Sequence, residues 1–251
     1  MLAAACQQAQ AGAVAPKLAK LGLASFVAMP VRVVGKSAAA PASCASNMVR
    51  VEGEYCPEVE QTCVDWLDPP GPFRRCHRYD KPAKCLKPRQ SLRFCIERGE
   101  HVPAGETLPV NGKSFLEAGR ICARAGARLC KESEWNFACE GEELRPYPYG
   151  WERDPSACNA DHLLLAAGGH MLRDLRSGPG EYPRCASPFG VLDMAGNLEE
   201  LVARDDRPTR PALKGAHWLP GRNHCRARQT IHGSGYAGIE IGFRCCSDLA
   251  G

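Results

Sequence analysis

The chain has 251 residues, of which 32 are basic and 28 acidic, so its formal net charge is +4. Hydrophobic residues make up 44% and charged residues 24%, a balance that excludes disordered, collagen-like and coiled-coil chains. The charge is too small to indicate a nucleic-acid-binding protein, and we expect no nucleic-acid partner. The 15 cysteines are far above the usual frequency and predict a disulfide-rich, exported protein of an oxidising compartment.

Residues 1–46 form an Ala-rich tail with almost no acidic side chains, which predicts a signal or linker segment. Residues 2–6 end a small-residue run at Cys6, as in a lipoprotein signal whose cysteine is lipidated, and this interpretation requires a start upstream of Met1. Residues 17–40 offer a second signal, with two lysines, an apolar stretch and a small-residue cleavage region; an unstructured linker is the third alternative. The apolar stretch is too short to span a bilayer, so we expect membrane contact only through a lipid anchor.

Residues 47–107 are expected to open with a strand and to continue as a cysteine-rich insertion. Residues 48–51 alternate in polarity before a turn, as a strand does. No helical or strand period follows, and the cysteines predict a loop-rich segment held by disulfides, namely Cys44, Cys56, Cys63, Cys76, Cys85 and Cys95. A set of basic side chains fits a solvated loop face, which we favour, or a surface for a polyanion or anionic headgroups: Arg74, Arg75, Arg78, Lys81, Lys84, Lys87 and Arg89.

Residues 108–248 are expected to form the core of the domain. Ser114 and Glu117 have the spacing of a capping box, which predicts a helix that begins after Ser114 and ends at Gly126. A second, short helix is predicted over Glu132–Cys139. From residue 147 onward the sequence is typical of turns and short strands.

Several segments, taken in order, resemble the formylglycine-generating enzyme, or sulfatase-modifying factor, family. They are ARLCKESEWNFAC at 127–139, YPYG at 147–150, CNAD at 158–161, SPFGVLDMAGNLEE at 187–200, LKGAHW at 213–218, CRAR at 225–228 and IGFRC at 241–245. The resemblance covers residues 108–248 well, but residues 47–107 only by the first strand and residues 94–97. It implies one compact, loop-rich α+β domain over residues 47–248, held by disulfides and distantly like C-type lectins.

Active members of that family convert a sulfatase cysteine to formylglycine with O2 and a copper ion bound by two cysteines. Thiolates suit this chemistry because soft sulfur ligands select Cu(I). The corresponding stretch here, residues 215–228, is several residues shorter and holds only Cys225, which matches a structural cysteine of the family. A shifted alignment makes Cys225 the second catalytic cysteine, with Pro220 in place of the first. Both alignments leave the pair incomplete, so we assign no catalytic residue and expect no copper.

The resemblance also implies disulfides and calcium. The family's structural cysteines correspond to the pairs Cys122–Cys245 and Cys139–Cys225. Its best-preserved calcium site corresponds to a side-chain oxygen, two backbone carbonyls and a carboxylate, which suit a hard cation: Asp193, Gly196, Leu198 and Glu200. A second, weaker site would begin at the Asn159 side chain and the Ala160 carbonyl, with Asp174 as the nearest downstream carboxylate.

We therefore predict an exported domain without the oxidase site, which works as a binding or accessory module for an extended peptide or a glycan. One alternative is an active formylglycine-generating oxidoreductase, and another is a structural surface lipoprotein. The location would be periplasmic, cell-surface or extracellular. Three histidines near residues 215–228 would fit a new metal site, but partnered or exposed histidines are the favoured interpretation: His217, His224 and His232.

Overall fold

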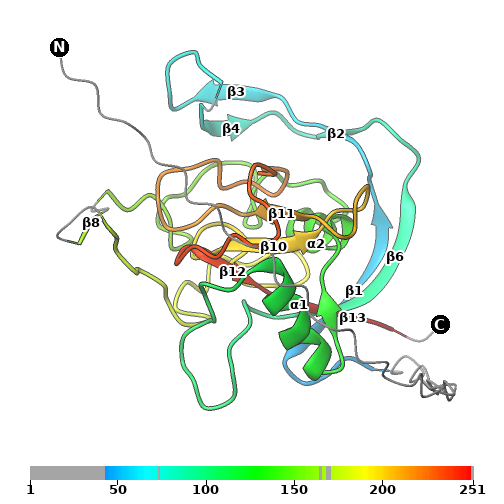
Figure 1. Cartoon of the computed structure of the whole chain (residues 1–251). Coiled ribbons are helices and arrows are strands. Elements are labelled where there is room, and N and C mark those ends of the chain that lie inside the picture. Colours follow the sequence, from blue (N-terminus) through cyan, green and yellow to red (C-terminus); the bar gives the residue numbers. More distant parts are fainter. Residues whose placement is uncertain (1–42, 73, 164–165, 168–170, 250–251) are drawn as a thin grey trace, which may run out of the picture. The chain divides into compact units, whose positions relative to one another are not determined.

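A four-stranded antiparallel sheet brings the first and the last strands of the domain together (Figure 1). The computed structural model describes residues 43–72, 74–163, 166–167 and 171–249; Cys6 and most of the predicted tail lie outside them. The strand order is β1–β6–β13–β7, with β1 at Met48–Tyr55, β6 at Gln90–Glu97, β13 at Cys245–Asp248 and β7 at Arg128–Leu129. Residues 94–97, which carry the early resemblance, thus form the C-terminal half of β6.

Two helices and a smaller sheet complete the core. Helix α1 (Phe115–Arg124) begins with the predicted capping box, and α2 (Glu132–Glu140) extends one residue beyond the prediction. The second sheet has the order β11–β10–β12, with β11 at Pro211–Lys214, β10 at Glu199–Ala203 and β12 at Ile241–Phe243. A short pair, β8 (Ala166–Ala167) and β9 (Met171–Leu172), lies apart from both sheets. Neither described helix is long and apolar enough to cross a bilayer.

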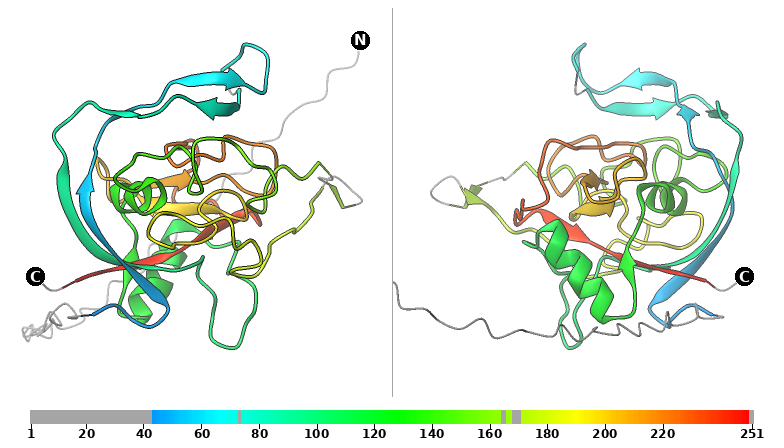
Figure 2. Two further views of the ribbon diagram at one scale, coloured as in Figure 1. Left: turned by 180° about the vertical axis from the view of Figure 1, so that it is seen from behind. Right: turned by 45° about the vertical axis from the view of Figure 1, so that its right-hand side comes forward.

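The cysteine-rich segment differs from the loop-rich insertion that we predicted. Figure 2 shows it as a long antiparallel ribbon that continues from β1 and β6. Its outer part, residues 56–89, is called the distal ribbon here and contains two strand pairs: β2 (Val59–Glu60) with β5 (Lys84–Cys85), and β3 (Cys63–Trp66) with β4 (Cys76–Tyr79). The predicted disulfides are present, but the prediction missed the strand pairs, because most side chains of the distal ribbon stay partly exposed and leave no burial period in the sequence.

Seven disulfides pair all the cysteines of the described residues. Two of them link the two sides of the distal ribbon, one ties the segment before β1 to β6, and four join segments of the core, including both pairs that the resemblance implies. Each closes a loop and would add about 2–4 kcal/mol on the loop-entropy account. Their number indicates an oxidising environment. The pairs are Cys44–Cys95, Cys56–Cys85, Cys63–Cys76, Cys122–Cys245, Cys130–Cys246, Cys139–Cys225 and Cys158–Cys185.

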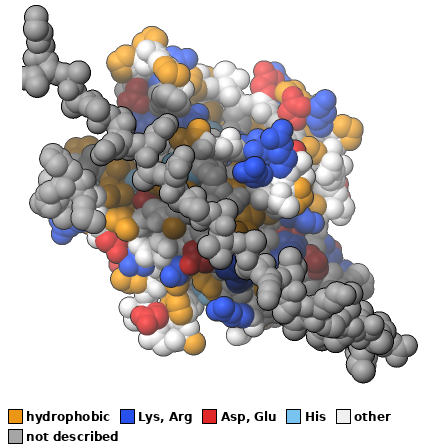
Figure 3. All heavy atoms as spheres, in the orientation of Figure 1, with side chains coloured by type: hydrophobic (Ala, Val, Ile, Leu, Met, Phe, Trp, Pro, Cys, Tyr) orange, Lys and Arg blue, Asp and Glu red, His pale blue; other side chains and the backbone are white. Residues whose placement is uncertain are grey.

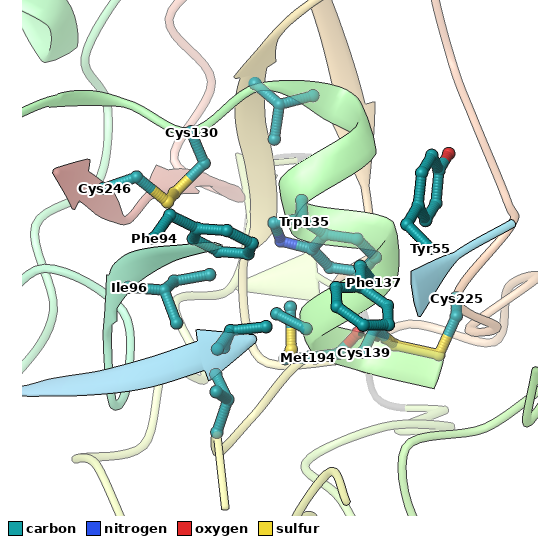
Figure 4. Packing of buried hydrophobic residues seen from close by; sticks show 14 of the residues in the cluster. Tyr55, Phe94, Ile96, Cys130, Trp135, Phe137, Cys139, Met194, Cys225 and Cys246 are labelled. Atoms are coloured by element: carbon teal, nitrogen blue, oxygen red, sulfur yellow. Dashed lines mark hydrogen bonds between the residues drawn. A yellow bond between two sulfur atoms is a disulfide. The ribbon is translucent and has the colours of Figure 1, made fainter. Parts of the chain in front are cut away.

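The main hydrophobic core lies between α2 and the four-stranded sheet. Figure 4 shows Trp135 and Phe137 of α2 packed with Phe94 and Ile96 of β6, and Met194 closing the cluster from a loop. The loop that precedes β10 is held in place by the core. The Met194 side chain is buried there, and the disulfide-bonded cysteines before and after it in the sequence are buried too. Residues 43–249, with the gaps given above, thus form one compact α+β domain, as predicted.

Candidate functional site

The loop of the predicted calcium site, residues 193–200, runs from the core into β10. Asp193 and Asn197 adopt left-handed backbone conformations, with φ of 59° and 54°. Gly196 has φ +87°, and a Cβ there would lie 2.3 Å from the carbonyl oxygen of Asn159. Only glycine therefore allows this close approach between the two segments that the resemblance associates with calcium.

Asp193 is buried without a conventional partner for its charge. Its side chain is 2% exposed, and neither carboxylate oxygen has a hydrogen-bond partner. Burial raises the pKa of Asp193 to about 6, although the nearby Arg244 guanidinium and a Gly180 amide outside hydrogen-bond geometry oppose this rise. A buried, unpaired carboxylate is costly and calls for a cation.

Glu200, the other predicted carboxylate ligand, is held by protein groups. Arg244 donates to it from Nε and Nη2, each at 2.6 Å, and the Trp135 indole donates at 3.0 Å. Sequence analysis missed this role of Arg244, which lies 44 residues further along the chain. A cation bound by Glu200 would therefore have to share its carboxylate with Arg244.

Glu100 adds a third buried carboxylate to this cluster, and it was also missed. One of its oxygens accepts a hydrogen bond from the Leu198 amide at 2.9 Å, and the other pairs with the Asn197 side chain. Burial, with the charges of Glu200 and Asp193 nearby, raises the pKa of Glu100 well above its usual value. Its separation of 98 residues from Leu198 explains why no local motif revealed it.

The residues of this loop fit a hard cation. Three buried carboxylates surround one guanidinium, and the Asp193 oxygens have no other partner. If Ca2+ binds, Asp193 and the carbonyls of Gly196 and Leu198 would hold it, with Glu200 as a shared ligand.

The second predicted calcium site has other partners. The Asn159 amide donates to the Leu175 carbonyl and to Asn197 Oδ1, both at 2.8 Å, while Asn159 Oδ1 contacts His162 Nε2 at 2.7 Å. Asp174 forms an ion pair with Arg176 at 2.7 Å. The polar atoms of Asn159 and Asp174 are thus used by protein partners, which leaves the second site, with the Ala160 carbonyl, less suited to a cation than residues 193–200.

A cavity of about 260 Å3 lies over the stretch that corresponds to the family's active site. The end of β11 and the loop after it form most of its wall, and Gly215 and Ala216, with φ of 83° and 54°, make the sharp turn there. The lining residues with polar side chains are Glu199, His217, Arg222, Arg228 and Gln229.

Glu199 and His217 give this cavity its titratable chemistry. Burial, together with the Glu240 carboxylate, raises the pKa of Glu199 to about 7. Burial lowers the pKa of His217, and its Nδ1 atom is shielded from solvent without a hydrogen-bond partner. Near neutral pH the cavity thus offers a carboxyl group that can donate or accept a proton, beside a neutral imidazole. Glu199 was missed as a site residue, although it stands next to the predicted ligand Glu200.

Cys225 is unavailable as a metal ligand beside this cavity. It is completely buried and bonded to Cys139. Every other described cysteine is also in a disulfide, so the described residues offer no thiolate to copper. Glu97, His101 and Cys245 also lie close enough together to suggest a metal site. Cys245 is bonded to Cys122, however, so it offers no thiolate to a metal there. His232 stacks on Tyr236, with ring centroids 3.8 Å apart.

Comparisons with known proteins point to the same family as the sequence motifs. Residues 54–249 match the family model described as "Sulfatase-modifying factor enzyme 1-like domain". The chain is 31% identical over 156 residues to inactive C-alpha-formylglycine-generating enzyme 2 of Mus musculus, which covers 56% of this chain and 49% of that protein. It is 37% identical over 113 residues to hercynine oxygenase of Mycobacterium tuberculosis, covering 43% of this chain and 24% of that protein. The chain thus spans about half and about a quarter of these relatives.

A solved structure shares the fold. PvdO from Pseudomonas aeruginosa superposes with a TM-score of 0.53 at 17% sequence identity, covering 80% of this chain and 94% of that chain.

Proposed function

We propose that this chain, which belongs to the sulfatase-modifying factor family, is an exported binding domain without formylglycine-generating activity. The family resemblance inferred from the sequence is confirmed by the match over residues 54–249. The observation that carries the proposal is the Cys139–Cys225 disulfide, because it takes up the only cysteine between Gly215 and Arg228. A copper site of the family's kind requires two free thiolates there.

Two further observations support this proposal. A relative of this chain bears the description of an inactive formylglycine-generating enzyme. Furthermore, the cavity keeps titratable side chains where the resemblance places the catalytic stretch, so it can still bind a ligand. We infer that an extended peptide or a glycan binds there, with Glu199 and His217 as hydrogen-bonding groups.

Export and calcium belong to the same proposal. Seven disulfides favour the periplasm, the cell surface or the extracellular space over a reducing cytosol. Lipidation at Cys6 is one way in which such a domain would be anchored. Calcium at residues 193–200 would hold the loop that leads into β10 and thus into the cavity wall.

Oxygen uptake and product mass, measured with copper and a Cys-x-Pro-x-Arg peptide, test the loss of oxidase activity. Two variants break the same disulfide: Cys139→Ser frees the Cys225 thiol, and Cys225→Ser removes it. We expect no formylglycine from the wild type or from either variant. Product formed by the wild type, retained in Cys139→Ser and lost in Cys225→Ser, would establish the active oxidoreductase instead. A peptide and glycan array, with Glu199→Gln as the control for the cavity, tests binding, and no hit would leave the structural lipoprotein as the better interpretation.

A further inference from the structure

The distal ribbon and the core enclose a second cavity, of about 200 Å3, which shares only Arg222 with the lining of the first cavity. Backbone hydrogen bonds hold β4 on the core: the Tyr79 amide donates to the Trp151 carbonyl at 3.0 Å, and the Arg153 amide donates to the His77 carbonyl at 2.7 Å. The Cys63–Cys76 disulfide ties β3 to β4. Both walls of this cavity are therefore fixed by bonds.

Arginines dominate the lining of this cavity. The ribbon contributes Arg74 and Arg75, and the core contributes Arg153 and Arg222. Two carboxylates are committed within this group: Asp68 binds Arg75 at 2.7 Å, and Asp161 binds Arg153 at 2.6 Å. Arg74 adds a third guanidinium to those of Arg75 and Arg153, against these two carboxylates, so the cavity favours an anionic ligand.

Arg74 has no carboxylate partner among the described residues. Its guanidinium lies 3.6 Å from the ring centroid of Trp66, which holds it in place by a cation–π contact and leaves its N–H groups to bind a ligand. Arg75 Nη1 is only weakly engaged, at 3.5 Å from Asp161. Guanidinium groups bind oxyanions through paired, charge-assisted hydrogen bonds.

His224 supplies a neutral donor or acceptor to the same cavity. The residue is partly buried, and its Nδ1 atom is shielded from solvent and has no hydrogen-bond partner. Burial and the nearby cations Lys214, Arg222 and Arg153 keep this imidazole uncharged, lowering its pKa to about 3. The neutral imidazole thus lines the cavity beside the arginines without adding a charge of its own.

Aromatic surfaces accompany these charges. Trp66 is 41% exposed, and the rings of Tyr79 and Tyr147 meet edge to face at 5.8 Å. Flat apolar faces beside cationic groups suit a sugar or another ring that carries the anion.

The remaining basic side chains of the ribbon argue for a small ligand rather than a long polyanion. Arg78, Lys84 and Lys87 have acidic neighbours, at 3.6 Å from Glu152, 3.4 Å from Glu60 and 3.7 Å from Glu58. Figure 3 shows acidic and basic side chains interspersed over the face that it presents. These acidic neighbours partly neutralise the basic surface that the sequence offered to a polyanion, so the cavity is the better place for an anion.

We propose that the cavity between the distal ribbon and the core, lined by Arg74, Arg75, Arg153, Trp66 and His224, binds an oxyanion, sulfate or phosphate, carried on a sugar ring. This site does not depend on the loss of oxidase activity, so either proposal can fail while the other holds.

Calorimetric titration of the disulfide-intact protein tests the site with four probes: sodium sulfate, sodium phosphate, a sulfated disaccharide and glucose 6-phosphate. We expect binding of at least one ring-borne oxyanion more tightly than its inorganic counterpart, and weaker binding as NaCl is added. Arg74→Gln should weaken it about tenfold or more, whereas Arg124→Gln, an exposed arginine at the end of α1, should leave it unchanged. Trp66→Ala should remove the advantage of the sugar-borne anion.

Three results would overturn the proposal. They are no binding of any of the four probes, binding that Arg74→Gln leaves unchanged in a variant with the wild-type melting temperature, and equal affinities for inorganic and sugar-borne anions. The first two refute the anion site, and the third refutes the ring. Formylglycine production by the wild type would bear only on the oxidase question.

Discussion

Arg244 binds Glu200 through two parallel hydrogen bonds of 2.6 Å, and both side chains are almost completely buried, at 0% and 1% exposure. The same guanidinium donates to the backbone carbonyls of Glu97 at 3.2 Å and Leu192 at 3.0 Å. It thereby ties the residue between β12 and β13 to β6 and to the start of the candidate calcium loop. With Glu100 and Asp193 nearby, Arg244 is the main positive charge facing three buried carboxylates.

Removing this guanidinium should therefore destabilise the domain and increase its dependence on cations. We expect Arg244→Met to lower the free energy of unfolding by about 3–5 kcal/mol, since a buried carboxylate then loses its partner. Added Ca2+ should stabilise this variant more than the wild type, because the cation would replace the missing charge. Urea unfolding with and without Ca2+ measures both effects, with Arg124→Met, an exposed arginine in the last turn of α1, as the control. Equal effects of Ca2+ on variant and wild type would contradict the shared cluster.

Lys214 is a buried cation whose charge works against folding. Burial lowers its pKa to about 7 from an ordinary value of 10.5, and Glu132, 3.8 Å away, only partly compensates. Below about pH 7 both the folded and the unfolded chain are protonated, and the folded state bears the full cost of the buried charge. Between about pH 7 and 10.5 the unfolded chain binds more protons, so this cost falls and stability rises with pH.

Lys214→Met should therefore be more stable than the wild type at pH 6, and its advantage should shrink toward pH 10. The groups that face Lys214 remain balanced in the variant, because Glu132 still binds Arg228 at 3.0 Å and Glu140 still binds Arg226. Melting temperatures across this range, with the exposed Lys87→Met as a control, provide the measurement. A stability difference that does not change with pH would show that Lys214 keeps an ordinary pKa.

Local signals in the sequence were sufficient for α1 but not for the acidic cluster. The capping box of Ser114 and Glu117 lies within four consecutive residues, and the structure contains both of its hydrogen bonds. In contrast, Glu100, Asp193 and Arg244 meet only after folding, and their chemistry arises from burial that no short segment encodes. Asp193 was predicted as a ligand because it matches a calcium position of the family, whereas no motif in the sequence indicated Glu100.

The distal ribbon illustrates a second limit. Its strands are held by disulfides and by backbone bonds to the core, so they need no alternating hydrophobic face, and that alternation is what predicts strands. The positions of the cysteines in this segment predicted disulfides but did not determine which cysteines pair. The arginine-rich cavity was equally hidden, because Arg74 and Arg222 come from opposite ends of the domain.

The strongest test of the candidate site is the response of stability to calcium. The Asp193 carboxylate has no hydrogen-bond partner and lies among other carboxylates, so Ca2+ should bind the folded state and not the unfolded chain. At a hundredfold excess over the dissociation constant, such binding adds about 2.7 kcal/mol to the free energy of unfolding. For a domain of this size, that corresponds to about 5–10 °C in melting temperature.

EDTA should accordingly lower the melting temperature of the wild type, and Asp193→Ala should abolish most of this sensitivity. Without calcium, the same substitution should cost little, because it removes a buried carboxylate that has no partner. Asp174→Ala, which removes a surface carboxylate near the second predicted site, should leave the response to EDTA intact, since its ion pair with Arg176 is partly exposed. Calorimetric melting of the three proteins in Ca2+ and in EDTA decides the matter: a wild-type melting temperature that EDTA does not change would show that no stabilising cation binds at Asp193.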